Sequence, residues 1–328
     1  MKQQHIFITG ANGFIGRHLC RHLAQLGMWV TACVRPTSDV STLEGVEGVR
    51  IMRVPEAGPT PALETQFAGV DAVVHLAARV HVMHDASSDP LAEFRRVNVG
   101  GTERLAHIAA DNGVRRFVYI SSIKVNGEAT GARSFTADDL PGYVDPYGRS
   151  KWEAEQKLEE IATARGMEWV IIRPPLVYGP GVRGNFLALM KCLRRGLPLP
   201  LGSVENQRSI VSVYNLVDLL ERALLHPAAS GQRFLVKDQE DVSTADLVRR
   251  LALALQTRAL LIPVPSSFLL MSSRLLRQQD AVQRLCSSLV VNTEKTAQLL
   301  QWMPPLSLDR GLGTTCTWFN AAASDGML

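Results

Sequence analysis

The chain lacks the features that mark secreted, metal-binding and membrane-spanning proteins. Its five cysteines are scattered and no two lie two residues apart, which predicts reduced thiols and no metal site. The most apolar late stretch, 259–271, is broken by prolines and serines, so no segment reaches the roughly 20 residues of a membrane span. The first residues run directly into an apolar strand and do not resemble a signal peptide. We therefore expect a cytoplasmic protein without membrane insertion.

An excess of one charge is also nearly absent. Lys and Arg number 35 and Asp and Glu 31, so the net charge is only +4, and no dense basic run accompanies it. A nucleic-acid partner is not predicted. The 328 residues, 46% apolar and 20% charged, are typical of a globular protein with a large core and one or two domains.

The N-terminal segment has the pattern of a dinucleotide-binding unit. Residues 5–9 predict a buried strand, Gly10, Gly13 and Gly16 follow, and helical periodicity then leads to a second strand at 28–34. Glycines at such a turn let the backbone approach a pyrophosphate, which the following helix N-terminus favours. The spacing is GxxGxxG, and a purely structural tight turn is the competing interpretation.

The end of the second strand bears on cofactor choice. NAD enzymes usually place Asp or Glu there to bind the ribose 2′-hydroxyl, whereas this chain has Val34-Arg35-Pro36. An arginine can pair with a 2′-phosphate, so Arg35 favours NADP(H), with NAD(H) as the other possibility and Arg17 and Ser38 as helpers. A solvated loop arginine is the competing interpretation.

Further strands at 49–54, 71–79 (running into a small-residue turn), 117–121 and 168–173 alternate with predicted helices, among them a short one at 61–68 and a longer one at 98–112. This alternation predicts an α/β fold with a doubly wound parallel sheet, in which ligands bind beyond the carboxyl ends of the strands. The small-residue turn Leu76-Ala77-Ala78 would let a cofactor pass closely, and residues 80–93 are assigned to substrate. We expect His75 to be structural.

A serine pair and a Tyr–Lys pair supply the chemistry. Ser121 and Ser122 follow the fifth strand, while Tyr147 and Lys151 lie one turn apart on a predicted helix. A cation beside a phenol stabilises the phenolate, so Lys151 is expected to lower the pKa of Tyr147 and make it a proton donor. Taken alone, each pair could be structural.

The second half has a looser rhythm. Helices are predicted near 185–195, 215–225, 244–256 and 266–289, with a strand at 233–237. We assign residues 1–173 to a dinucleotide-binding domain. Residues 174–328 form mainly a smaller substrate lobe that is interleaved with the sheet, to which the chain returns at about 205–240.

An ordered set of motifs resembles the extended short-chain dehydrogenases/reductases, in their nucleotide-sugar epimerase/dehydratase/reductase branch. The resemblance covers nearly the whole chain through TGANGFIG (9–16), HLAA (75–78), NVGGT (98–102), YISSIKVNG (119–127), YGRSK (147–151), RPPLVYGPG (173–181) and the tail at 290–312.

The resemblance implies an NAD(P)-dependent enzyme and a role for each matched position. Tyr147 would be the acid/base, Lys151 would hold the nicotinamide ribose, and Ser122 would orient the substrate oxygen. The other implied cofactor-binding residues are Gly10, Asn12, Gly13, Phe14, Ile15, Gly16, Arg35, Leu76, Ala77, Ala78, Asn98 and Pro174. The implied substrate-binding residues are His81, Lys124, Asn126, Asn185 and Arg208, the last two at positions that bind the diphosphate in sugar-nucleotide members.

Three departures from the family pattern matter. Val54-Pro55 replaces the usual Asp-Leu, Asn126 stands in a VNG that is usually VYG, and Lys124 occupies a position that is often small or hydroxyl-bearing. The last two alter the substrate side and speak against a simple UDP-galactose 4-epimerase.

Three functions follow from the resemblance. Arg35 favours an NADPH-dependent reductase of a 4-keto-6-deoxy nucleotide sugar, with a UDP-linked N-acetylhexosamine as the expected substrate, serving surface polysaccharide synthesis. The alternative is an NAD(P)-dependent nucleotide-sugar 4-epimerase. A non-catalytic dinucleotide-sensing protein is disfavoured because Ser122, Tyr147 and Lys151 are all present. Dehydration is disfavoured because Ile123 and Lys124 replace the usual Asp-Glu.

The resemblance also implies a homodimer. Many family members pair the helix before the serine strand with the Tyr–Lys helix, which here are roughly 100–112 and 147–165.

Overall fold

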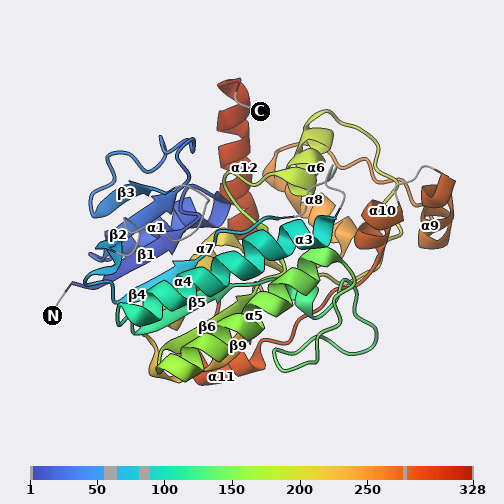
Figure 1. Ribbon diagram of the computed structural model, residues 1–328. Coiled ribbons are helices and arrows are strands. Elements are labelled where there is room, and N and C mark those ends of the chain that lie inside the picture. The colour runs from blue at the N-terminus through green and yellow to red at the C-terminus, as the bar shows by residue number, and fades with distance from the viewer. Residues whose placement is uncertain (1–2, 55–64, 81–88, 276–278, 327–328) are drawn as a thin grey trace.

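The computed structural model describes residues 3–54, 65–80, 89–275 and 279–326. A seven-stranded parallel sheet forms its centre, in the order β3-β2-β1-β4-β5-β6-β9 (Figure 1). This order confirms the predicted doubly wound sheet. The strands are β1 (His5–Thr9), β2 (Trp29–Val34), β3 (Val49–Arg53), β4 (Ala72–His75), β5 (Arg116–Ile120), β6 (Glu168–Arg173) and β9 (Gln232–Leu235).

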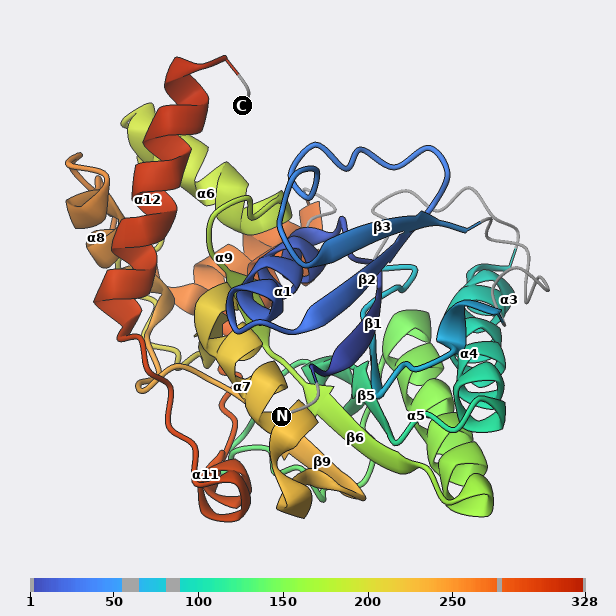
Figure 2. The ribbon, with the colours of Figure 1, turned by 90° about the vertical axis from the view of Figure 1, so that its left-hand side faces the viewer.

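Both faces of the sheet are covered by helices, so the inner positions of its central strands β1 and β4 are apolar rather than alternating. In β1, Ile6 and Ile8 enter the core on one face and Phe7 enters the core on the other. Helices α1 (Phe14–Gln25) and α7 (Val213–Leu225) cover the first face, and α4 (Gly100–Asp111) and α5 (Pro146–Arg165) cover the second (Figure 2).

Helix α5, which carries the Tyr–Lys pair, is closed at both ends. Asp145 is its N-cap and accepts a hydrogen bond of 2.6 Å from the Gly148 amide, with Pro146 at the first helical position. Gly166 ends the helix at φ 67°, in the left-handed conformation that favours glycine. The Asp145 cap fixes where the helix starts, and therefore where Tyr147 and Lys151 face.

A helical lobe follows the sheet domain. It contains α6 (Gly184–Arg194), α8 (Thr244–Ala254), α9 (Ser266–Leu275), α10 (Gln279–Cys286) and the long α12 (Leu308–Ser324), which packs on α8. Its core is separate from the two sheet cores. Between the lobe's segments the chain returns to the sheet, because α7 packs on α1 and β9 pairs with β6.

Several elements differ from the sequence-based expectation. The short strands β7 (Leu176–Tyr178) and β8 (Ile210–Ser212) form a second parallel pair, α11 (Glu294–Leu300) and α12 had no predicted counterpart, and the helical stretch from 266 is divided into α9 and α10. The predicted helix at 98–112 begins as a π-helical turn, η2 (Arg95–Val99), after α3 (Pro90–Phe94). Of the predicted helix at 61–68, the described part is the 3-10 turn η1 (Thr65–Phe67). In the described part of the chain, no helix is long and apolar enough to cross a membrane.

Candidate active site

The glycine turn after β1 is built for close backbone approach. Gly10 has φ 66°, and a Cβ there would lie 2.8 Å from the amide nitrogen of Ala77. A Cβ on Gly16 would lie 2.3 Å from the carbonyl oxygen of Gly10. Side chains are therefore excluded at both positions, and the turn can press against the neighbouring strand end and against a ligand.

The N-terminus of α1 is open to a ligand. Its N-cap is Gly13, which has no side chain to cap the first amides, and the first turn contains no acidic residue. Free amides and the positive end of the helix dipole then point toward the sheet edge. The cradle and the helix end together fit the pyrophosphate of a dinucleotide.

The turn after β4 is held by hydrogen bonds to its neighbours. The Thr9 hydroxyl shares a 2.6 Å hydrogen bond with Nδ1 of His75 and accepts one of 3.2 Å from the Ala77 amide. Burial and then the nearby Lys151 lower the pKa of His75 to about 3, so this histidine stays neutral. These contacts agree with the structural role expected for His75.

Asn98 joins the turn after β4 to α5 through hydrogen bonds. Its side-chain oxygen accepts from the Arg79 amide at 2.8 Å, while its amide group donates to the Arg79 carbonyl at 3.1 Å and to the Ser150 hydroxyl at 2.9 Å. The side chain is buried and engaged by protein on both sides. Its direct contact with a cofactor stays a prediction.

The structure brings Ser122 and Tyr147 together. The Tyr147 hydroxyl is hydrogen-bonded to the Ser122 side chain. The Tyr147 ring packs edge-on against Phe94, with ring centroids 5.9 Å apart. The neighbouring Ser121 hydroxyl is buried and has no hydrogen-bond partner within the described ranges. The Ser122 hydroxyl and the Tyr147 phenol therefore meet just beyond the carboxyl end of β5.

The expected lowering of the Tyr147 pKa by Lys151 is not found in the protein chain alone. Burial raises the pKa of Tyr147 to about 12, the hydrogen bond to Ser122 lowers it, and Asp145 raises it. The Lys151 ammonium instead donates to the Ile120 carbonyl at 2.7 Å and to the Tyr119 hydroxyl at 3.1 Å. Sequence spacing placed both side chains on one helix face but could not show these competing acceptors.

Lys151 itself is strongly perturbed. It is 2% exposed, and burial lowers its pKa to about 7, against the raising effect of Glu155. A buried lysine poised near neutral pH is a sign of a functional site rather than of a surface salt bridge.

Glu155 is a buried residue of the site that the sequence analysis did not identify. It is fully buried and forms a bidentate pair with buried Arg173, at 2.9 and 2.6 Å. This pair joins α5 to the end of β6, just before Pro174. The available signal was the spacing, because Glu155 lies four residues after Lys151 and so on the same helix face.

A second missed residue is Asp145. Besides capping α5 it forms an ion pair with Lys124, which also pairs with Glu128 at 2.6 Å. The Asp-Pro pair before Tyr147 is a helix-start signal that could have identified the cap. Lys124 thus reaches the helix that carries Tyr147, on the side assigned to substrate.

The other predicted substrate residues lie in different settings. Asn126 is buried, donating to the Thr136 carbonyl at 2.8 Å and accepting from Arg173 at 3.0 Å. Asn185 is exposed at the start of α6. Arg208 donates to the carbonyls of Arg284 and Ser287, at 2.6 and 3.1 Å. His81 lies outside the described residues.

Of the predicted 2′-phosphate residues, Arg35 and Ser38 share one turn, in which the Ser38 amide donates to the Arg35 carbonyl at 3.1 Å. Arg35 is exposed just beyond β2. The Ser38 hydroxyl is buried and unpartnered as far as the described residues show. Arg17 instead donates to the Pro180 carbonyl at 3.2 Å and lies over the Phe14 ring, 5.8 Å from its centroid.

A doubly wound sheet, a glycine cradle and a Ser–Tyr–Lys set at one sheet edge define an enzyme of the extended short-chain dehydrogenase type. The chain belongs to the NAD dependent epimerase/dehydratase family, which matches residues 6–236.

Three comparisons place the chain among its relatives. It is 42% identical over 316 residues to the UDP-glucose 4-epimerase of Vibrio cholerae, covering 96% of this chain and 95% of the relative. It is 28% identical over 254 residues to the N-acetyl-alpha-D-glucosaminyl-diphospho-ditrans,octacis-undecaprenol 4-epimerase of Escherichia coli O157:H7, covering 74% and 70%. The crystal structure of UDP-glucuronic acid 4-epimerase from Bacillus cereus with NAD matches the fold, with a TM-score of 0.79, 22% identity and coverage of 97% and 99%.

Proposed function

We propose that the protein is an NAD-dependent 4-epimerase of a UDP-linked hexose. The observation that carries the proposal is the 42% identity to a UDP-glucose 4-epimerase over almost the entire chain, in a protein that keeps Ser122, Tyr147 and Lys151 at one sheet edge. The sequence alone favoured a reductase, and Lys124 and Asn126 spoke against a simple UDP-galactose 4-epimerase. The identity over almost the entire chain outweighs both expectations, so the two leading functions exchange rank.

The protein's own residues would move a proton at the sugar C4 oxygen. Tyr147 would accept the proton of the C4 hydroxyl, with Ser122 holding that oxygen. After the 4-keto sugar has turned its other face toward the cofactor, Tyr147 would return the proton to the same oxygen. Bound NAD supplies a place for the C4 hydride, which is given back in the second half of the reaction. Because the proton and the hydride both return, no cofactor is consumed.

Burial makes this proton transfer costly unless a cation assists. A phenol with a pKa of about 12 is a poor base at neutral pH, since the ideal catalytic pKa lies near the working pH. Lys151 is the cation that can supply charge inside the crevice, and Glu155 favours its protonated form. We infer that the Lys151 ammonium, once ordered toward a bound ribose, would stabilise the Tyr147 phenolate and so lower the pKa of Tyr147.

The substrate diphosphate would lie toward the helical lobe. Arg208 is partly buried there, with its guanidinium fixed by carbonyls of α10 and the following residue, and Asn185 stands at the open start of α6. Lys124 and Asn126 would shape the sugar side, Lys124 through its ion pairs and Asn126 through Arg173. A nucleotide sugar is the ligand class that these groups suit.

The reductase remains a second candidate because of Arg35. This exposed arginine stands where NAD enzymes usually carry an acidic residue, which favours NADP(H). If it contacts a 2′-phosphate, Arg35→Asp should weaken NADPH binding roughly 10- to 150-fold relative to NADH. Equal binding of the two cofactors by the wild-type protein would show that Arg35 makes no such contact.

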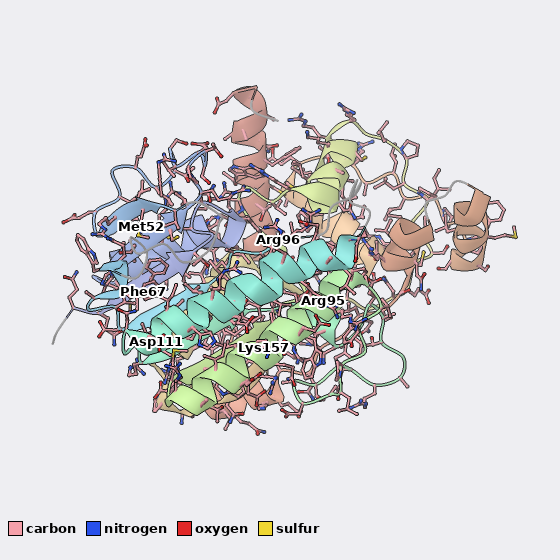
Figure 3. The ribbon with its side chains drawn as sticks, viewed as in Figure 1. Met52, Phe67, Arg95, Arg96, Asp111 and Lys157 are labelled. Atoms are coloured by element: carbon pink, nitrogen blue, oxygen red, sulfur yellow. The ribbon has the colours of Figure 1, made fainter. Side chains whose placement is uncertain are left out.

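Assembly through α4 and α5 stays part of the proposal, with a polar interface. Figure 3 shows side chains of Arg95, Arg96, Asp111 and Lys157 over this face. Ion pairs within the chain occupy it, including Arg95–Glu153 at 2.6 Å and Lys157–Glu160 at 2.9 Å. Stable homodimer interfaces are usually more apolar, so we expect a dimer whose mass in light scattering depends on concentration and salt. A 36.0 kDa species at every concentration would exclude it.

The function is tested by supplying two substrates separately. UDP-glucose with NAD should give UDP-galactose, seen as a second anomeric proton signal by NMR. A UDP-4-keto-6-deoxy-N-acetylhexosamine with NADPH should leave the NADPH absorbance unchanged. Stoichiometric NADPH loss with a new 6-deoxy sugar, and no UDP-galactose, would instead establish the reductase.

A further inference from the structure

The outer end of the helical lobe exposes large apolar side chains. Leu260, Ile262, Phe268 and Met271 are 51%, 46%, 56% and 59% exposed. They fall within twelve residues that lead into and along α9, which lies at the end of the molecule far from β3 (Figure 1). Scattered apolar residues are normal on a surface, but such a concentration marks an interaction site. We call these four residues the α9 patch.

The exposure belongs to an ordered segment. Leu199 exchanges backbone hydrogen bonds of 2.8 Å with Leu260 and Ile262, and the Gly202 amide donates to Ile262 at 3.0 Å. Leu261 and Leu269 pack against the core of the lobe. Leu260 and Ile262 flank Leu261 and so point to the other side of an extended chain, while Phe268 and Met271 are three apart on a helix.

The two segments that form and brace the α9 patch carry charge of one sign, with the nearest acidic residues, Glu205 and Asp280, just beyond them. Residues 186–204 and 251–275, which are joined by the bridge between Leu199 and Leu261, contain no Asp or Glu. They contain five basic residues: Lys191, Arg194, Arg195, Arg258 and Arg274. Arg195 and Arg258 are exposed. An apolar patch within acid-free basic segments complements an apolar surface that carries negative charge.

We propose that the α9 patch docks the enzyme on the surface of an anionic lipid bilayer. The apolar side chains enter the boundary between headgroups and acyl chains, and the arginines meet the phosphates. The inference goes beyond the proposed function and does not depend on it.

A second copy of the chain is the competing occupant, and the charge speaks against it. Two like patches would bring the basic segments of both copies together, and like charges repel. The face predicted for dimerisation is a different one, formed by α4 and α5. It contributes none of the large exposed apolar residues of the described chain.

Docking by this patch would hold the substrate side near the lipid. Helix α9 contacts α10, and Arg284 of α10 lies 3.9 Å from Glu128 and accepts through its carbonyl from Arg208. The lipid-facing patch and the predicted diphosphate residue are thus linked through one helix.

The test is sedimentation of the full-length protein with sucrose-loaded vesicles. Phosphatidylglycerol-containing vesicles should bind wild-type protein at low salt, and phosphatidylcholine vesicles should bind it much less. Phe268→Ser with Met271→Ser should weaken the partition coefficient at least about tenfold. Arg195→Glu with Arg258→Glu should do the same on anionic vesicles. Leu140→Ser with Met303→Ser is the control, since these residues are 88% and 76% exposed in other parts of the chain.

Circular dichroism melting checks that every variant is folded. Wild-type protein that stays in the supernatant, binding that does not distinguish the two lipids, or α9 patch variants that bind like the control would each overturn the proposal. If the α9 patch variants had a lower mass than the wild type in light scattering without vesicles, and bound vesicles as the wild type does, the patch would instead be a contact between copies of the chain.

Discussion

Replacing Lys151 by methionine should change how stability depends on pH. Burial lowers the pKa of Lys151 from 10.5 to about 7, so the unfolded chain binds more protons than the folded chain between those values. Stability of the wild-type protein therefore rises with pH in that window. Folding costs about 4 kcal/mol through this group at pH 7 and about 2 kcal/mol at pH 9. Below pH 7 the cost approaches a constant value.

The methionine variant lacks this slope. It loses the hydrogen bonds to Ile120 and Tyr119, each about 1 kcal/mol at any pH in this range, and it no longer pays the pH-dependent cost of burying a charge. Urea unfolding at pH 7, 8 and 9 should thus show the wild type gaining about 2 kcal/mol relative to Lys151→Met.

The control is Lys157→Met. Lys157 is on the same helix, but its side chain is 41% exposed and it pairs with Glu160. Its pH dependence should parallel that of the wild type. Because other titrating groups are shared by all three proteins, they cancel in the comparison. Parallel curves for wild type and Lys151→Met would refute the perturbed lysine.

Three further changes test the site. Tyr147→Phe should keep NAD binding, measured by calorimetry, and lose at least ~10²-fold in turnover; near-normal turnover would remove Tyr147 from the chemistry. Gly16→Ala should weaken NAD binding at least about tenfold, because its Cβ would lie 2.3 Å from the Gly10 carbonyl oxygen. The control Gly101→Ala, whose Cβ would have nothing within 4 Å, should bind NAD normally. Equal NAD binding by both variants would contradict the glycine cradle. Lys124→Met should move the rise of kcat/KM with pH to higher pH. Asp145 raises the pKa of Tyr147, and it would raise that pKa further once it loses its cationic partner Lys124. An unchanged pH profile would show that Lys124 does not influence Tyr147.

Local patterns predicted the sheet domain closely because each signal is short-range. The apolar runs at 5–9 and 168–173 coincide with β1 and β6, and Pro146 and Gly166 delimit α5. The glycine spacing predicted a cradle because backbone conformation, rather than distant packing, requires glycine there. Residue order alone was enough for these features.

Features that depend on distant contacts were missed. The β7–β8 pair joins residues far apart in the chain, and three-residue strands leave almost no periodic signal. The pairing of Glu155 with Arg173 and the turn of Lys151 toward Ile120 also depend on how α5 lies on the sheet. For the same reason, Tyr147 and Lys151 could be placed on one face while the direction of the Tyr147 pKa shift was predicted wrongly.

The central claim is that Tyr147 and bound NAD invert C4 of a UDP-hexose and return what they remove. Following UDP-glucose that carries deuterium at C4 tests this most directly. We predict UDP-galactose with the deuterium still at C4, no exchange with added unlabelled NADH, and no product from Tyr147→Phe on the same time scale. Loss of the label from C4 during turnover, or failure to form UDP-galactose while NADPH is consumed with a 4-keto sugar, would contradict it.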